Sequence, residues 1–368
     1  MSDFFQHRYY RTNKMLLKLT GQWPYQSTRT RLVLFASVTL LSISQVVPEA
    51  IAIVKHLDDW DILIECIMSL SFDGVCFTNF MLRLLNRMLT DWDVLARSSN
   101  VNVLHEYAEK GRKMTIVYTV AAYSTCVLFA TQPVVSKIID ILLKNGTEPG
   151  EFAIPVDYLI IDEQKYYFYI VLLHSVNISM AFTIMIAHDC MFIVYVYHCC
   201  GRIGKNKRSV KTYEIRHASV KLETHFKDLA SYAKLIEATY SWCFLFIVGL
   251  NMFLIIVTGL QVKIFGTTIE PQETLRFIAA NVFSLVHLYS PCHMAQILMD
   301  HSTSIRNSIL DSEWYRLPVK VQKYLVLMIM RCKIPCTLTA GKISTMSMEM
   351  FMMVLKTSLS YFTLLRSM

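Results

Sequence analysis

The stretch YYFYIVLLHSVNISMAFTIMIAHDCMFIVYVYH, residues 166–198, decides the fold class, because Asp189 is its only Asp, Glu, Lys or Arg. A helix needs about 20 mainly apolar residues to cross the hydrocarbon core of a bilayer, which is roughly 30 Å thick. The whole chain has the same character, with 54% hydrophobic and 17% charged residues, whereas a typical soluble domain has about 25% charged residues. The sequence therefore predicts an all-α polytopic membrane protein.

Seven stretches in all are long enough and apolar enough to be membrane spans. They are 32–54, 62–82, 115–143, 166–198, 239–265, 273–299 and, interrupted by Lys356, 343–365. The run 318–332 would reach only ~22 Å as a helix and lies among basic residues, so we expect a cytoplasmic helix with Pro318 in its first turn. The predicted organisation is a cytoplasmic segment 1–31, six spans over 32–299, a cytoplasmic anchor region 300–342 and the last span over 343–368.

The distribution of basic residues predicts the orientation. Lys and Arg number 27 in the segments 1–31, 83–113, 202–234 and 306–333, against six on the opposite side. Because basic residues accumulate in cytoplasmic loops, we expect a cytoplasmic N-terminus and an extracellular C-terminus. The early run MLLKL is too short for a signal peptide. The glycosylation sequon at Asn145 lies in the acidic loop that this orientation places outside.

The sequence gives no sign of catalytic or metal chemistry. Ten cysteines lie in apolar runs or beside basic stretches, which does not suggest a disulfide framework. Cys332 and Cys336 have no matching pair of histidines for a zinc site. His188 and Asp189 are neighbours on a helix and point about 100° apart, so they cannot act as a base and its orienting carboxylate. We expect a polar contact between helices there, no enzyme and no cofactor.

Several polar residues fall inside the predicted spans, where ionisable groups usually face protein or a water-filled cavity. They are Asp73, His174, Asn177, His188, Asp189, Asn281, His287 and Lys356. The outer halves of spans two, three, four and six also carry many Phe, Met, Leu and small residues. This composition suits a pocket for a small apolar ligand, but it suits ordinary helix packing as well, and composition alone favours packing.

Three stretches resemble the insect odorant receptor family. LKLTGQWPYQ (17–26) is similar to the Gly-x-Trp-Pro element before its first span, and IDEQKYYFYIVLLHSV (161–176) to the entry of its fourth span. The strongest resemblance is the C-terminal stretch 311–365, which begins DSEWYRLPVKVQKYLVLMIMRCKIPC. The number of spans, the length and the orientation also agree, so the resemblance covers nearly the whole chain.

Other receptor classes fit the residues less well. A G-protein-coupled receptor has an extracellular N-terminus, opposite to the charge distribution here. The related gustatory receptors end in Thr-Tyr, five apolar residues and Gln-Phe, whereas this chain has Ser360-Tyr361 followed by FTLLRSM. This favours an odorant receptor and leaves a gustatory receptor as the alternative. A transporter should show inverted repeats and broken helices. The chain has no internal repeat, although Pro48, Pro133 and Pro291 could break spans.

The resemblance implies a non-selective cation channel gated by small volatile molecules. This chain would be the odorant-tuning subunit of a heterotetramer with the shared odorant co-receptor, in the plasma membrane of olfactory sensory neuron dendrites. The resemblance places an apolar gate at Leu364, and Thr357, Tyr361 and Met368 lie within about 60° of it on a helix. Lys356 and Arg366 would hinder cations if four copies lined one pore, so we expect this subunit alone to conduct poorly.

The same resemblance places the odorant between spans two to six, in their outer halves. We expect aromatic and Met side chains to supply dispersion contacts, and amides or a hydroxyl to orient one polar group of the odorant. The predicted pocket residues are Met68, Phe72, Phe129, Ala130, Leu173, Asn177, Phe277, Asn281 and Ser284. Membrane lipid and the volatile ligand are the expected non-protein partners, and nothing suggests nucleic acid.

Overall fold

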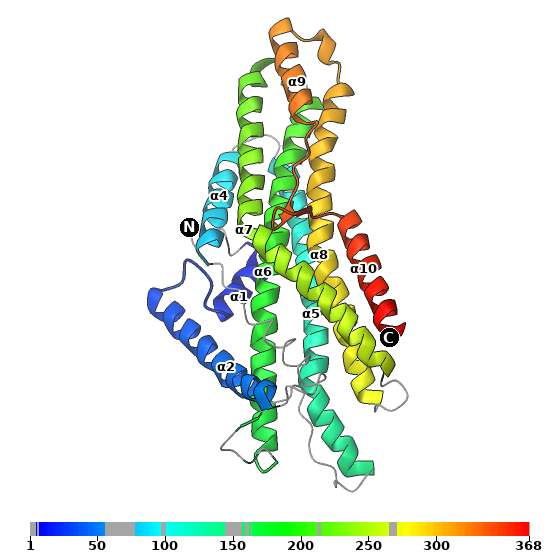
Figure 1. The fold of residues 1–368 in the computed structure, drawn as a ribbon. Helices are drawn as coiled ribbons and strands as arrows, with labels where there is room; N and C mark the ends of the chain where they lie inside the picture. Colours follow the sequence, from blue (N-terminus) through cyan, green and yellow to red (C-terminus); the bar gives the residue numbers. More distant parts are fainter. Residues whose placement is uncertain are drawn as a thin grey trace.

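The computed structural model describes residues 5, 7–55, 78–96, 101–143, 157–158, 162, 164–211, 215–264 and 271–367, and helices form almost all of them (Figure 1). Most of the predicted span 62–82 lies outside the described residues. So do Asp73, the predicted pocket residues Met68 and Phe72, the sequon residue Asn145 and the predicted pore residue Met368.

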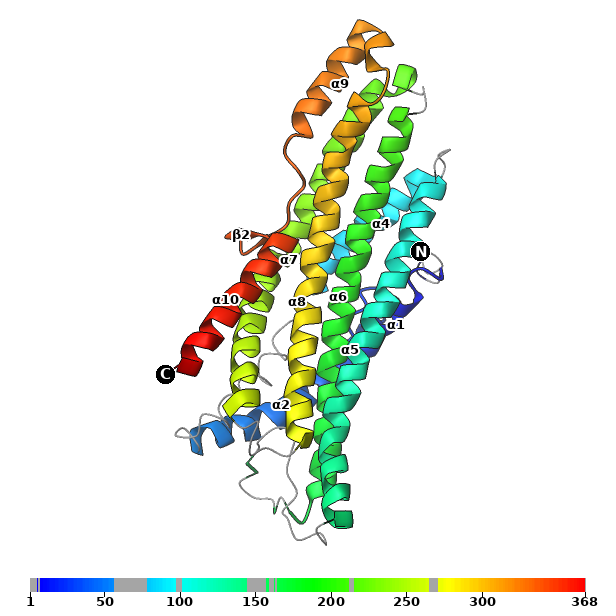
Figure 2. The ribbon, with the colours of Figure 1, turned by 90° about the vertical axis from the view of Figure 1, so that its right-hand side faces the viewer.

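Four long helices form the body of the molecule: α5 (Val101–Leu143), α6 (Tyr167–Lys211), α7 (Ile215–Ile264) and α8 (Pro271–Leu310). They run side by side as an elongated bundle (Figures 1 and 2). Each is longer than its predicted span, and the extra turns lie at the end where the basic residues accumulate. Hydropathy places the end of a predicted span at the first charged residues. The helical hydrogen bonds nevertheless continue through those residues, because the neighbouring helices extend alongside them.

Four of the described helices are long and apolar enough to cross a membrane, namely Thr28–Ala52, Val101–Ile139, Tyr167–Lys205 and Asp228–Gly259. Helix α8 and the last helix, α10 (Met348–Ser367), are also predicted spans but are not among these four. In α8 the polar residues Ser284, His287 and Ser290 are buried. Protein contacts therefore replace the lipid contacts that a uniformly apolar helix would make.

Helices α2 (Thr28–Lys55), α5 and α8 continue through Pro48, Pro133 and Pro291 without a break. Near one of these prolines the neighbouring helix supplies a polar contact, since the Tyr167 hydroxyl donates to the Pro133 carbonyl over 3.0 Å. Neighbouring side chains commonly satisfy backbone groups near proline in spanning helices. The broken helices expected of a transporter are not seen at these positions.

The N-terminal segment packs across the bundle ahead of α2. Helix α1 (Arg11–Leu19) ends at a turn where Gly21 has a φ of +70°, and a Cβ there would lie 2.8 Å from the Leu34 Cβ. Trp23 is buried and packs edge-on against Phe5. The Gly-x-Trp-Pro element thus forms a tight turn that joins α1 to α2, with glycine at the position where another residue would be strained.

An ionic cluster ties α4 (Thr78–Ala96) to the basic end of the bundle. The Asp91 carboxylate accepts a hydrogen bond from Arg202 Nη1 on α6 over 2.7 Å and lies 3.3 Å from His198 Nε2. Next to it, Trp92 Nε1 donates to the Tyr10 hydroxyl over 3.0 Å, and burial raises the pKa of Tyr10. The charges are paired and partly buried, which fixes α4 and the N-terminal segment against α6.

Beyond α8 the chain forms the helix α9 (Val319–Arg331), a short β-hairpin and α10. In the hairpin, β1 (Thr339–Ala340) pairs antiparallel with β2 (Ser344–Thr345). This places the start of α10 at Met348, five residues later than the predicted start of the span. The reason is local: Gly341 and Lys342 both have positive φ, which reverses the chain before the helix can begin.

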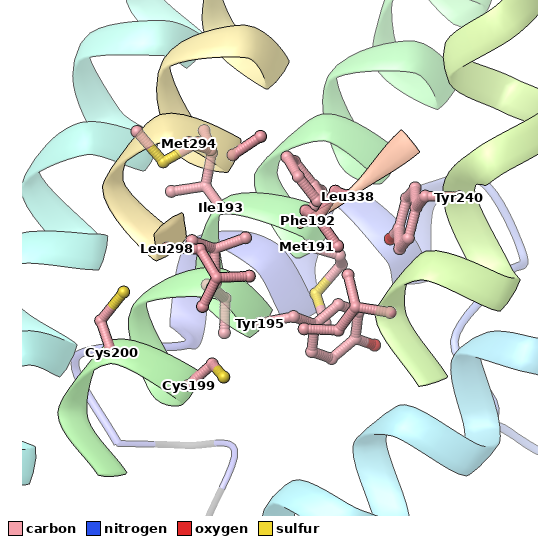
Figure 3. Packing of buried hydrophobic residues seen from close by; sticks show 14 of the residues in the cluster. Met191, Phe192, Ile193, Tyr195, Cys199, Cys200, Tyr240, Met294, Leu298 and Leu338 are labelled. Carbon is pink, nitrogen blue, oxygen red and sulfur yellow. The ribbon is translucent and has the colours of Figure 1, made fainter. Parts of the chain in front are cut away.

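The core of the bundle lies in the half of α6 nearer its basic end. From Cys190 to Val196 every side chain is buried, so α6 has no lipid-facing side there. Figure 3 shows Phe192, Tyr240 of α7 and Leu338 together in this core. Leu338 comes from the connection between α9 and the hairpin, which therefore anchors the route to α10 in the centre of the protein.

Candidate functional site

The predicted pocket residues that the structure describes lie on α5, α6 and α8. Phe129 and Ala130 on α5 and Leu173 on α6 are half-buried, while Asn177 on α6 is buried. Helices α5 and α6 are joined at this level, because the Ser175 hydroxyl donates to the Ala130 carbonyl over 3.1 Å. On α8 the remaining three residues follow one another at helical spacing, and these are Phe277, Asn281 and Ser284.

The two amides of the predicted pocket differ in their hydrogen bonding. Asn281 is half-buried, and its Nδ2 donates to the Phe277 carbonyl of its own helix over 3.1 Å. Asn177 is 7% exposed, and no described residue accepts a hydrogen bond from its Nδ2. A buried amide donor without a partner costs free energy. A ligand that accepts this hydrogen bond would remove that cost and so bind more tightly. Asn177 is the stronger candidate to orient a ligand.

About three helical turns further along α6, four helices meet at Asp189. Its carboxylate accepts a hydrogen bond from the buried Tyr118 hydroxyl of α5 and lies 3.4 Å from His287 Nε2 of α8. His287 Nδ1 in turn lies 3.2 Å from Asn251 Nδ2 of α7. The expected polar contact between helices is therefore present, but His188 does not pair with Asp189: the imidazole beside this carboxylate comes from α8.

Asn251 of α7 extends this cluster on the side of His287 that faces away from Asp189. Asn251 Nδ2 also donates to the Ile247 carbonyl over 2.7 Å, which identifies it as the amide nitrogen. The amide nitrogen of Asn251 therefore contacts His287 Nδ1, while His287 Nε2, 3.4 Å from the Asp189 carboxylate, makes no hydrogen bond within the described residues. A carboxylate inside a spanning helix is costly unless it is paired. Here the Tyr118 hydroxyl of α5 donates to the carboxylate, and the His287 imidazole of α8 lies beside it.

Helix α10 lies at the edge of the bundle, beside α7 and α8 (Figure 2). Its first turns face the protein through Met350, Val354 and Ser358, all of which are buried. The predicted pore residues lie mostly beyond this contact: Thr357 is half-buried, while Tyr361 and Leu364 are 50% and 56% exposed. Lys356 is also exposed. The last turns of α10 thus present a surface that this subunit does not itself cover.

The family model of the 7tm odorant receptors matches residues 75–359, more than three quarters of the chain. The chain belongs to the 7tm odorant receptor family. This confirms the resemblance and the all-α membrane fold expected from the sequence. The matched family is one of receptors.

Curated relatives and solved structures agree with the family. Odorant receptor 13a of Drosophila melanogaster is 24% identical over 208 residues, which cover 50% of this chain and 49% of that receptor. Odorant receptor 10 of Aedes albopictus is 26% identical over 165 residues, or 44% of this chain and 43% of that receptor. The chain therefore matches a little under half the length of these relatives. The olfactory receptor OR5 of Machilis hrabei, solved in complex with eugenol, superposes with a TM-score of 0.78 at 12% identity and covers 99% of both chains.

The odorant receptor fold brings together residues that no sequence pattern linked. Asp189 and His287 are 98 residues apart, and the partners Tyr118 and Asn251 were not among the polar residues singled out from the sequence. A tyrosine and an asparagine within apolar spans carry no spacing signal of their own. Only the packing of α5, α6, α7 and α8 brings Tyr118 and His287 to one carboxylate and Asn251 to that imidazole.

Proposed function

We propose that this chain is the odorant-tuning subunit of a cation channel that opens when a small volatile molecule binds. The observation that carries the proposal is the surface of α10. In a protein of the odorant receptor family, a terminal helix at the edge of the bundle, with Tyr361 and Leu364 half exposed, is suited to face a shared pore in an assembly. The shared co-receptor would supply the other subunits, and the complex would lie in the dendrite membrane of olfactory sensory neurons.

The proposed ligand site lies between α5, α6, α8 and the second span, in their outer halves. Asn177 offers a buried donor for one polar group of the odorant, and Phe129, Leu173 and Phe277 offer apolar contact. Met68 and Phe72, outside the described residues, would complete the site. A ligand opens the channel only to the extent that it binds the open state more tightly than the closed state.

The proposed gate is a hydrophobic constriction at Leu364, with Thr357 and Tyr361 lining the path. Lys356 and Arg366 on the same helix disfavour a pore made of four copies of this chain. The segments 1–31 and 300–342 would lie in the cytoplasm, with α9 as part of the anchor.

Whole-cell recording across an odorant panel tests this function, with this chain expressed alone, the co-receptor alone, or both together. We expect odorant-evoked cation currents only when both are present. Robust currents from this chain alone would contradict the subunit role. The absence of current from the pair, with both chains at the cell surface and the panel exhausted, would contradict the channel.

The pocket is tested with the pair of variants Asn177→Leu and Ser179→Ala. Leucine keeps the branched shape of Asn177 with slightly more bulk and removes its donor, whereas the Ser179 hydroxyl donates to the Ser175 carbonyl of its own helix over 2.7 Å. For an odorant with a hydrogen-bond acceptor, we expect Asn177→Leu to raise the half-maximal concentration about tenfold, the loss of about 1.4 kcal/mol. Ser179→Ala should leave the response unchanged. Equal responses of both variants and the wild type would remove Asn177 from the pocket.

A further inference from the structure

An open cavity lined by none of the proposed odorant-pocket residues lies near the basic end of the bundle. It has a volume of about 410 Å³ and is bounded by α7, by the last turns of α8 and by residues 332–337, the segment that follows α9. Figure 2 shows this segment running from α9 along the bundle to the β-hairpin and α10. Ligand pockets in proteins typically have about 300–1,000 Å³, so the cavity is large enough for a small organic molecule.

The walls of the cavity combine an apolar surface with one donor and one acceptor. Ala230 and Ile305 belong to its apolar part, while Lys234 and Glu237 stand one turn apart on α7. In the part of the chain that the structure describes, Lys234 makes no ion pair. Glu237 Oε1 accepts a hydrogen bond from the Thr339 hydroxyl over 2.9 Å, which leaves its other oxygen for a further donor. An ammonium group that only donates, close to a carboxylate that only accepts, matches a hydroxyl group, which does both.

The opposing charges also argue against an ionic ligand. A carboxylate near Lys234 would be repelled by Glu237, and an amine near Glu237 would be repelled by Lys234. A neutral molecule avoids both penalties and keeps the apolar contact. We propose that this cavity binds a small neutral amphiphile, an aliphatic alcohol in its simplest form, with its hydroxyl between Lys234 and Glu237 and its chain against Ala230 and Ile305.

The cavity is placed to influence α10. One of its walls is the backbone around Cys336, whose N–H donates to the Ser302 hydroxyl of α8 over 3.0 Å. Three residues later, Thr339 is held by Glu237, and the Gly341 N–H donates to the Ser241 carbonyl over 2.8 Å. The hairpin then leads directly into α10. A ligand that contacts this wall therefore contacts the segment that positions the proposed pore helix. The coupling between this cavity and the pore rests on the proposed function.

The half-buried Cys336 lines the cavity and serves as a native reporter. N-ethylmaleimide alkylates a thiol by forming a carbon–sulfur bond across its double bond, and the thiol proton ends on the neighbouring carbon. The test measures the alkylation rate of Cys336 by peptide mass spectrometry in membranes that contain this chain with the co-receptor, with and without 1-octanol. Octanoate and octylamine are the charged comparisons, and octane lacks the hydroxyl.

We expect octanol to slow alkylation of Cys336 about tenfold at ten times its dissociation constant, because only the empty cavity reacts. The three comparison compounds should protect less at equal membrane concentration. Lys234→Met should raise the octanol concentration that gives half-maximal protection about tenfold, as expected for the loss of a hydrogen bond to a charged group. Ala230→Phe, which fills the cavity, should slow alkylation without octanol.

Three results would overturn the site: no protection by octanol, equal protection by octane, or protection unchanged in Lys234→Met. Alkylation of Cys336 only after the assembled channel is dissociated would also overturn it, because a neighbouring subunit would then cover the cavity. The coupling is tested separately by odorant responses, where Ala230→Phe should shift the half-maximal odorant concentration at least threefold at normal surface expression. Alkylation needs no current, so an absent odorant response counts against the channel and not against the cavity.

Discussion

The substitution Gly341→Ala probes the junction between the hairpin and α7. Gly341 has a φ of +58°, and an added Cβ would lie 2.6 Å from Leu245 Cδ2 and 3.2 Å from Leu245 Cβ and Cγ. An L-residue in this backbone conformation costs about 1–2 kcal/mol. The contact with Leu245 cannot be relieved by moving Cδ2 alone, because Cβ and Cγ are also close, and overpacking typically costs about 1–3 kcal/mol. We expect Gly341→Ala to destabilise the protein by about 2–5 kcal/mol.

The measurement is the free energy of unfolding of the purified chain in a reversible detergent titration, followed by its helical circular dichroism. The double variant Leu245→Ala/Gly341→Ala removes the steric part, so the alanine at 341 should then cost only about 1–2 kcal/mol relative to Leu245→Ala alone. Lys342→Ala is the matched control. Lys342 has a φ of +60° itself and is exposed, so this variant exchanges one L-residue for another and should change stability by less than about 0.5 kcal/mol.

A loss below about 0.5 kcal/mol in Gly341→Ala would refute the reasoning, since neither the backbone nor the contact would then be constrained. A full loss that Leu245→Ala fails to reduce would refute the steric part alone. Under the proposed function, Gly341→Ala should also shift the odorant response, because the hairpin sets where α10 begins.

The cluster around Asp189 and the proposed gate make two further predictions. Tyr118→Phe removes the hydroxyl that donates to the Asp189 carboxylate and should destabilise the protein by about 1–2 kcal/mol in the same titration. In the control Tyr123→Phe, the lost hydroxyl contacts a neutral threonine, so the cost should be about half as large. Equal costs would mean that the Asp189 charge does not strengthen the contact. Leu364→Gln should raise the basal current of the assembled channel because a polar side chain wets a hydrophobic gate, while Leu359→Gln, on the other side of α10, should not. Unchanged basal current in Leu364→Gln at normal surface expression would remove Leu364 from the gate.

The prediction of a long apolar helix over 166–198 is confirmed, because it depends on local physics. The apolar stretch 166–198 has to form its backbone hydrogen bonds within itself in lipid, so α6 follows from its own residues. The ends of the helices did not follow in the same way. Helix α7 begins at Ile215, far before the predicted span at 239, and its polar part is tied to α4, where Arg87 Nη2 lies 3.3 Å from Asp228 Oδ1.

The sequence by itself determined the class of this protein: an all-α membrane protein of the odorant receptor family, with its basic residues gathered at one end. Composition, hydropathy and the C-terminal pattern are properties of the chain read in order, and they need no knowledge of contacts. Only the tertiary structure decided which partners meet. It paired Asp189 with Tyr118 and His287 rather than with His188, and it brought Glu237 to Thr339 and Lys234 to the wall of a cavity, because these contacts join helices far apart in sequence.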